Sequence, residues 1–120
     1  MKLSYKRADR LGEFIQTEVS DIILRKIKDP RIRLVTITGV DVSDDLRMAR
    51  VYFSVMGDEK QCQKAMDGLK SATGFIKKSL GPRLDLRYVP DIEFHYDRSL
   101  EYGERIDKLL REIKEEHGNS

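Results

Sequence analysis

Residues 69–81 constrain the fold of this chain most, because their pattern is helical but their middle disfavours a straight helix. Side chains at helical spacing mark one face of this stretch and of the residues before it: Cys62, Met66, Leu69, Thr73, Ile76 and Leu80. In a straight helix, Phe75 would point about 120° away from that face. Gly74 costs about 1 kcal/mol relative to alanine inside a helix. We therefore predict a kink or break at residues 72–74, which rotates Phe75 into the core.

The same stretch is cationic. Residues 68–84 contain no aspartate or glutamate, but they include four basic residues: Lys70, Lys77, Lys78 and Arg83. The net charge of the whole chain is only +2, so a basic surface must be local. Such a surface at a helix break suits phosphate groups, and we expect Arg7, Arg10 and the basic residues after the first helix to extend it. An ordinary solvated helix face remains the alternative interpretation.

Before this stretch, the sequence predicts one helix and a β-hairpin. Apolar residues recur at helical spacing over about residues 7–28, and Asp29-Pro30 ends the helix, because the residue before a proline avoids the helical conformation. Two alternating segments follow, at 35–42 with a bulge at Gly39 and at 49–55, and they predict antiparallel strands. The basic cluster between the helix and the first strand consists of Arg25, Lys26, Lys28, Arg31 and Arg33.

After the hairpin, Asp58 can cap the helix that leads into the cationic stretch. A third strand is predicted over residues 86–96, either as an edge strand or beginning after Pro90, which cannot donate to a ladder. Ser99 can cap a terminal helix. Each strand has one apolar and one polar face, which predicts an α+β domain of two layers with helices on one side of a small sheet. We assign residues 1–116 to this single domain and residues 117–120 to a disordered tail.

Composition and motifs argue against several other classes of protein. No apolar run approaches the ~20 residues that span a bilayer, and the first residues lack the apolar middle of a signal peptide. The single cysteine, Cys62, cannot form an internal disulfide, which favours the cytoplasm. His95 beside Glu93 indicates a surface ion pair rather than a general base, and no cysteine or histidine spacing indicates a metal site. We therefore predict no catalytic residues, no metal and no cofactor.

The order of elements resembles the type II KH fold, in which a GXXG loop between two helices clamps a nucleic-acid backbone. This sequence contains no GXXG and has an Ala-x-Gly motif, Ala72-Thr73-Gly74, at the corresponding place. With three further segments, this motif makes residues 6–110 resemble the bacterial ribosome-binding factor A family. Those segments are Lys28-Asp29-Pro30-Arg31, the strand Val35–Val42, and Val89-Pro90-Asp91-Ile92-Glu93-Phe94 followed by Asp97-Arg98-Ser99.

The resemblance implies a two-layer KH-like domain, α-β-β-α-kink-α-β with a C-terminal helix, whose Ala-x-Gly kink replaces the GXXG loop. It also implies a cytoplasmic, non-catalytic factor in ribosome biogenesis with importance in the cold. Such a factor binds the immature small (30S) ribosomal subunit and its precursor rRNA, and it supports late 5′-end maturation of that rRNA. We expect a monomer with no membrane or small-molecule partner. The predicted RNA-binding residues are Arg7, Arg10, Lys70, Ala72, Thr73, Gly74, Lys77, Lys78 and Arg83.

Two other functions remain open at this point. The chain could be a protein-interaction or regulatory adaptor that pairs with a partner through an exposed sheet edge. An RNA-processing enzyme ranks last, because the sequence offers no constellation of catalytic residues.

Overall fold

The computed structural model describes residues 2–98 of the chain, with side chains from Arg7 onward. The elements in chain order are α1 (Lys2–Lys26), the 3-10 helix η1 (Pro30–Ile32), β1 (Val35–Val42), β2 (Met48–Val55), α2 (Glu59–Leu80), the 3-10 helix η2 (Gly81–Arg83) and β3 (Asp91–Tyr96). The predicted terminal helix and the tail at 117–120 lie outside the described residues.

The three strands form one sheet in the order β1-β2-β3. β1 and β2 pair antiparallel, as predicted, and their register shifts between Ile37 and Gly39, so the predicted bulge is present. β2 and β3 run parallel, with α2 connecting them along the chain. β1 and β3 are therefore the two edge strands of this sheet.

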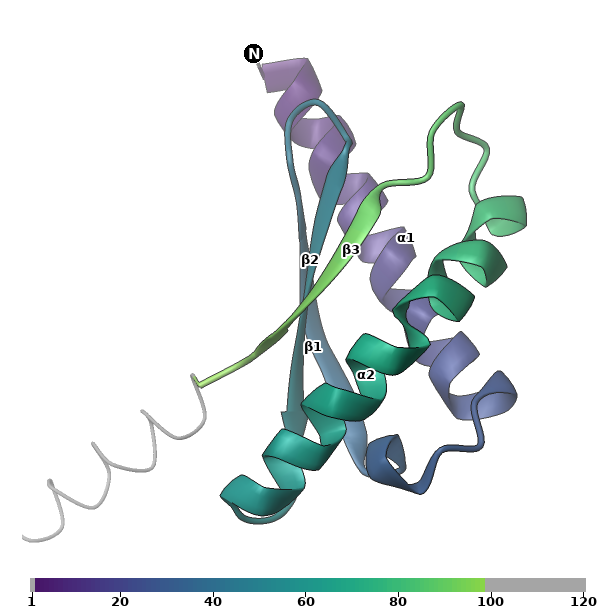
Figure 1. The fold of residues 1–120 in the computed structure, drawn as a ribbon. Helices are drawn as coiled ribbons and strands as arrows, with labels where there is room; N and C mark the ends of the chain where they lie inside the picture. The colour runs from purple at the N-terminus through teal and green to yellow at the C-terminus, as the bar shows by residue number, and fades with distance from the viewer. Residues whose placement is uncertain (1, 99–120) are drawn as a thin grey trace, which may run out of the picture.

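The fold has the two predicted layers, with α1 and α2 packed on the apolar face of the sheet (Figure 1). Alternate strand residues point into this core, and the chief ones are Ile37, Ala49, Val51, Phe53, Ile92 and Phe94. The helices supply its other half, chiefly Ile15, Val19, Ile22, Leu69, Ile76 and Leu80. None of the polar residues between the buried positions of β2 and β3 is buried. The strict alternation in the sequence therefore reflects a sheet that the described residues cover on one side only.

A buried glycine sets the distance between α1 and β1. A Cβ atom on Gly12 would lie 2.9 Å from the carbonyl oxygen of Val40, closer than a side chain can approach a backbone. α1 begins and ends earlier than the predicted span of 7–28. After it, Asp29 caps η1, since its Oδ1 accepts a hydrogen bond from the backbone N–H of Arg31 at 2.9 Å.

The predicted break at residues 72–74 is wrong, because α2 is helical without interruption from Glu59 to Leu80. A kink within this continuous helix stays a prediction. The predicted cap of this helix is confirmed: the Asp58 carboxylate accepts from the backbone N–H of Gln61 at 3.0 Å. Phe75 is 48% exposed instead of lying in the core. The pair of helices expected on either side of Gly74 is thus one long helix.

Packing explains why Gly74 does not end the helix. The hydroxyl of Thr73 donates to the backbone carbonyl of Leu69 at 2.8 Å, so the helix itself satisfies that polar group. Leu69 and Ile76 are fully buried on either side of the glycine, and burying a side chain of this size contributes about 1.5–3 kcal/mol. That stabilisation exceeds the ~1 kcal/mol that a glycine costs in a helix.

The third strand is shorter than the predicted 86–96. It begins at Asp91, directly after Pro90, which agrees with the expectation that a proline would not pair within the strand. Leu86 and Tyr88 were assigned to its apolar face, but both are exposed in the loop between η2 and β3. Both residues alternate with charged neighbours as in a strand, but within residues 2–98 no strand pairs with this segment.

Candidate nucleic-acid interface

The exposed side of α2 carries a row of five residues, which we call the α2 ridge: Lys70, Ser71, Gly74, Phe75 and Lys78. All five are exposed, and their spacing places them on one side of the helix. The buried residues of α2 occupy the other side: Ala65, Gly68, Leu69, Ile76 and Leu80. The amphipathic pattern of the helix therefore orients the ridge toward solvent.

Gly74 lies in the middle of the α2 ridge and leaves its backbone uncovered, because glycine has no side chain. A Cβ atom at this position would have no neighbour within 4 Å, so the backbone is open to a ligand there. Lys70 and Lys78 each lie four residues away, roughly 6 Å along the helix axis on either side. Neither lysine forms an ion pair within residues 7–98. Two uncompensated ammonium groups thus flank an open stretch of backbone.

Phe75 adds an aromatic ring to the same ridge. A half-exposed ring beside two lysines offers a flat surface on which a nucleobase can stack. The sequence contained the signal for this position, because Phe75 lies off the apolar face of a straight helix. Phe75 was left out of the predicted RNA-binding residues only because a kink was expected to turn its ring into the core.

Lys77 and Arg83, both predicted to bind RNA, are engaged with carboxylates. The Nζ of Lys77 lies 2.6 Å from Oδ1 of Asp91, where β3 begins. The guanidinium of Arg83 bridges Glu18 at 2.7 Å and Asp21 at 2.9 Å, both on α1. Hydrogen bonds to Glu18 and then Asp21 raise the pKa of Arg83. These two basic residues connect α2 and η2 to the rest of the fold.

The other predicted residues divide between the ridge and more distant positions. Ala72 and Thr73 are only partly exposed, and the Thr73 hydroxyl is bonded within the helix. Arg7 and Arg10 are exposed on the N-terminal half of α1. Along α1 they precede Glu18, the partner of Arg83, by roughly 12–17 Å. They therefore lie N-terminal to the part of α1 that contacts Arg83.

Arg31, one member of the basic cluster after α1, packs against α2 just before the ridge. A Cβ on Gly68 would meet the Cγ2 of Ile32 at 2.8 Å and the Cβ of Arg31 at 3.2 Å, so η1 lies directly against α2. The Arg31 guanidinium is held by Asp29, with Nη2 and Oδ2 2.7 Å apart. Hydrogen bonds to Arg31 keep the pKa of the Asp29 carboxyl below its ordinary value. The close contact between η1 and α2 therefore lies at Gly68.

The face of the sheet opposite the helices carries a contact between a histidine and a glutamate. His95 contacts Glu93 and packs its ring near Tyr52, with 5.7 Å between ring centres. Within the described residues, no three histidine, cysteine or acidic side chains are grouped in a way that could hold a metal ion. No helix in the same part of the chain has the length and apolar character needed to cross a membrane.

Comparison with known proteins gives consistent matches over most of the chain. The family Ribosome-binding factor A matches residues 7–110. A Ribosome-binding factor A from Halothermothrix orenii is 54% identical over 111 residues, which cover 92% of this chain and 91% of that protein.

Solved structures agree with the sequence matches. The solution structure of a Thermotoga maritima protein, described as a putative ribosome binding factor A, has a TM-score of 0.69 at 30% identity and covers 78% of this chain and 89% of that one. A homology model of the Thermus thermophilus factor, fitted into a cryo-EM map of its complex with the 30S subunit, has a TM-score of 0.61 at 25% identity and covers 72% and 91%. Since the family match spans most of its length, this chain belongs to the ribosome-binding factor A family.

Proposed function

We propose that this protein is a non-catalytic assembly factor that binds the immature small ribosomal subunit and its precursor rRNA through the α2 ridge. Family membership supports ribosome binding, and a Thermus thermophilus relative has been fitted into a map of a 30S complex. The observation that carries the proposed site is the pair Lys70 and Lys78 flanking the open backbone of Gly74. The proposal includes a cytoplasmic location and no catalytic activity of the protein itself.

The chemistry of the ridge suits an RNA backbone more than a particular base sequence. The lysines attract phosphates, and contacts of that kind position a protein without reading sequence. The missing side chain at Gly74 allows the sugar-phosphate chain to approach the helix, and Phe75 can stack on an unpaired base. Specificity then depends on the shape of the folded rRNA. We further propose that holding this shape supports late 5′-end maturation by separate nucleases.

Binding to purified small subunits tests the site. We expect Lys70→Ala combined with Lys78→Ala to weaken binding roughly tenfold, about 1.4 kcal/mol. The slope of log affinity against log salt should fall by roughly one unit per lost phosphate contact. The matched control is Lys60→Ala combined with Lys64→Ala, which removes two exposed charges from the first turns of the same helix. Equal losses in the two double variants would show that overall charge, and not the ridge, determines binding.

The aromatic part of the site has its own test. Phe75→Leu keeps an apolar side chain but removes the ring, so we expect weaker binding to small subunits with an unchanged salt slope. An unchanged affinity would remove base stacking from the proposal and leave phosphate contacts alone. A cleavage of rRNA by the purified protein would contradict the non-catalytic role.

A further inference from the structure

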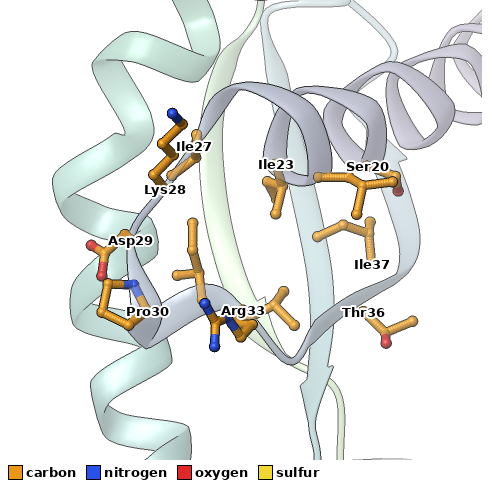
Figure 2. Close-up of a pocket in the computed structure, with 12 residues that line it drawn as sticks. Ser20, Ile23, Ile27, Lys28, Asp29, Pro30, Arg33, Thr36 and Ile37 are labelled. Atoms are coloured by element: carbon orange, nitrogen blue, oxygen red, sulfur yellow. The ribbon is translucent and has the colours of Figure 1, made fainter.

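A groove separates the end of α1 from the start of β1, on the edge of the sheet opposite β3. Its volume is about 710 Å³, and it is lined by the last turns of α1, the segment containing η1, and residues 35–37 of β1. Figure 2 shows Ile23 of α1 and Ile37 of β1 pointing toward each other across it. With Ile27, Ile32 and Val35 they give the groove an apolar lining. Leu24, which also lines it, is 82% exposed.

The groove runs along an unpaired strand edge. β1 is hydrogen-bonded to β2 on one side only, and alternate peptide groups of an edge strand point away from its partner. One of them, the carbonyl of Ile37, accepts a bond from Nε2 of Gln16 at 3.3 Å. Within residues 7–98, no other side chain bonds to the backbone of 35–37. The remaining outward groups of 35–37 have no hydrogen-bond partner in the described part of the chain.

The charged side chains at the groove are predominantly basic. Lys28 and Arg33 both line it, are exposed, and form no ion pair within residues 7–98. Asp29, the only acidic residue that lines the groove in the described part of the chain, is bonded to the Arg31 guanidinium. The uncompensated charge at this groove is therefore positive, and it complements a segment that carries carboxylates.

Two properties favour a protein segment over a single strand of RNA here. Among the described residues, none that lines the groove is aromatic, whereas single-stranded RNA is bound largely by stacking on aromatic rings. An open strand edge beside apolar side chains matches the way an extended peptide binds, with backbone bonds to the edge and alternate side chains in the groove. We propose that the edge of β1 binds an extended, acidic segment of a partner protein, which adds a strand next to residues 35–37 and places its carboxylates near Lys28 and Arg33.

None of the residues that line this groove belongs to the α2 ridge, so peptide binding here can be tested without ribosomes. The probe is a blocked synthetic peptide of alternating valine and threonine that ends in two glutamates, used with the full chain. We expect saturable NMR shifts of the backbone amides of 35–37 and of the methyl groups of Ile23 and Ile27. A peptide with two lysines in place of the glutamates should bind at least roughly tenfold more weakly. Two N-methylated peptides complete the set: one is methylated at its odd-numbered amides and the other at its even-numbered amides, which we call the two N-methyl phases. Because only alternate amides face β1, one phase should abolish binding and the other should leave it intact.

Protein variants give an independent readout. Lys28→Glu combined with Arg33→Glu should weaken the acidic peptide at least roughly tenfold, whereas Lys60→Glu combined with Lys64→Glu should leave its affinity unchanged. All four positions are exposed, and equal melting temperatures of the two variants verify that both are folded. The proposal is overturned if the lysine peptide binds as tightly, if both N-methyl phases bind alike, or if the shifts fall elsewhere. Tighter binding of an oligouridylate in the same groove would assign the groove to RNA instead.

Discussion

Helix α2 contains two glycines, and their surroundings differ. Replacing each of them with alanine tests how α2 packs against the rest of the fold. Gly68 and Gly74 both lie inside the same helix, so changing either to alanine gains about 1 kcal/mol of helix propensity. At Gly74 the new methyl group enters open space. We therefore expect Gly74→Ala to raise the free energy of unfolding by about 1 kcal/mol. A kink that requires glycine at this position would instead make the alanine variant less stable than the original chain.

Gly68→Ala gains the same propensity but meets the Cγ2 methyl of Ile32 at 2.8 Å. Ile32 is 2% exposed, and its branched Cβ fixes the methyl group, so it cannot swing aside. Overpacking of this kind costs about 1–3 kcal/mol. Since the propensity gain cancels between the two variants, their difference in the free energy of unfolding measures the overpacking at η1 alone.

Urea denaturation of the two alanine variants, followed by far-UV circular dichroism, measures this difference. The m-values should agree, and the midpoint of Gly74→Ala should be the higher. In thermal melts, 1 kcal/mol corresponds to a shift of about 4 °C for a domain of this size. Equal stabilities would mean that η1 is not seated against Gly68. A destabilised Gly74→Ala variant would mean that the glycine is required for backbone geometry, as the kink hypothesis holds.

Three further outcomes follow from single contacts. Phe75→Leu should change the free energy of unfolding by less than about 1 kcal/mol in urea melts, because the ring is half exposed; a larger loss would place the ring in the core. Arg83→Ala should lower the melting temperature by stranding two carboxylates of α1, among them Glu18, and 1 M salt should shrink the difference; a salt-independent loss would exclude an electrostatic cause. The lowered pKa of Asp29 means that its bond to Arg31 stabilises the fold above the unfolded value of about 3.9, and that this stabilisation disappears as pH falls through the lower folded value. Carbon-13 NMR titration of Asp29 should show a higher pKa in Arg31→Ala, and an unchanged pKa would contradict the hydrogen-bond origin of the shift.

Local patterns in the sequence were enough to predict the two hairpin strands, the bulge between them and the cap of α2. Alternation of apolar and polar residues over 35–42 and 49–55 predicted both hairpin strands, because every second side chain of a strand points to the same face of the sheet. The shift of this alternation at Gly39 predicted the bulge. The Asp58 cap could also be predicted from the sequence, since a cap depends on residues three positions apart. These features involve neighbours along the chain, so their physical causes are contained in short segments.

Only the tertiary structure decided how the glycines and basic residues are used. Gly68 and Gly74 look alike in sequence, but one is pressed against η1 and the other faces open space. Lys70 and Arg83 belong to the same acid-free stretch, yet the partners of Arg83 lie 62 and 65 residues away on α1. Whether a basic side chain is available to a ligand depends on which distant carboxylates the fold brings beside it. That information arises from packing between elements and is absent from the pattern within any one of them.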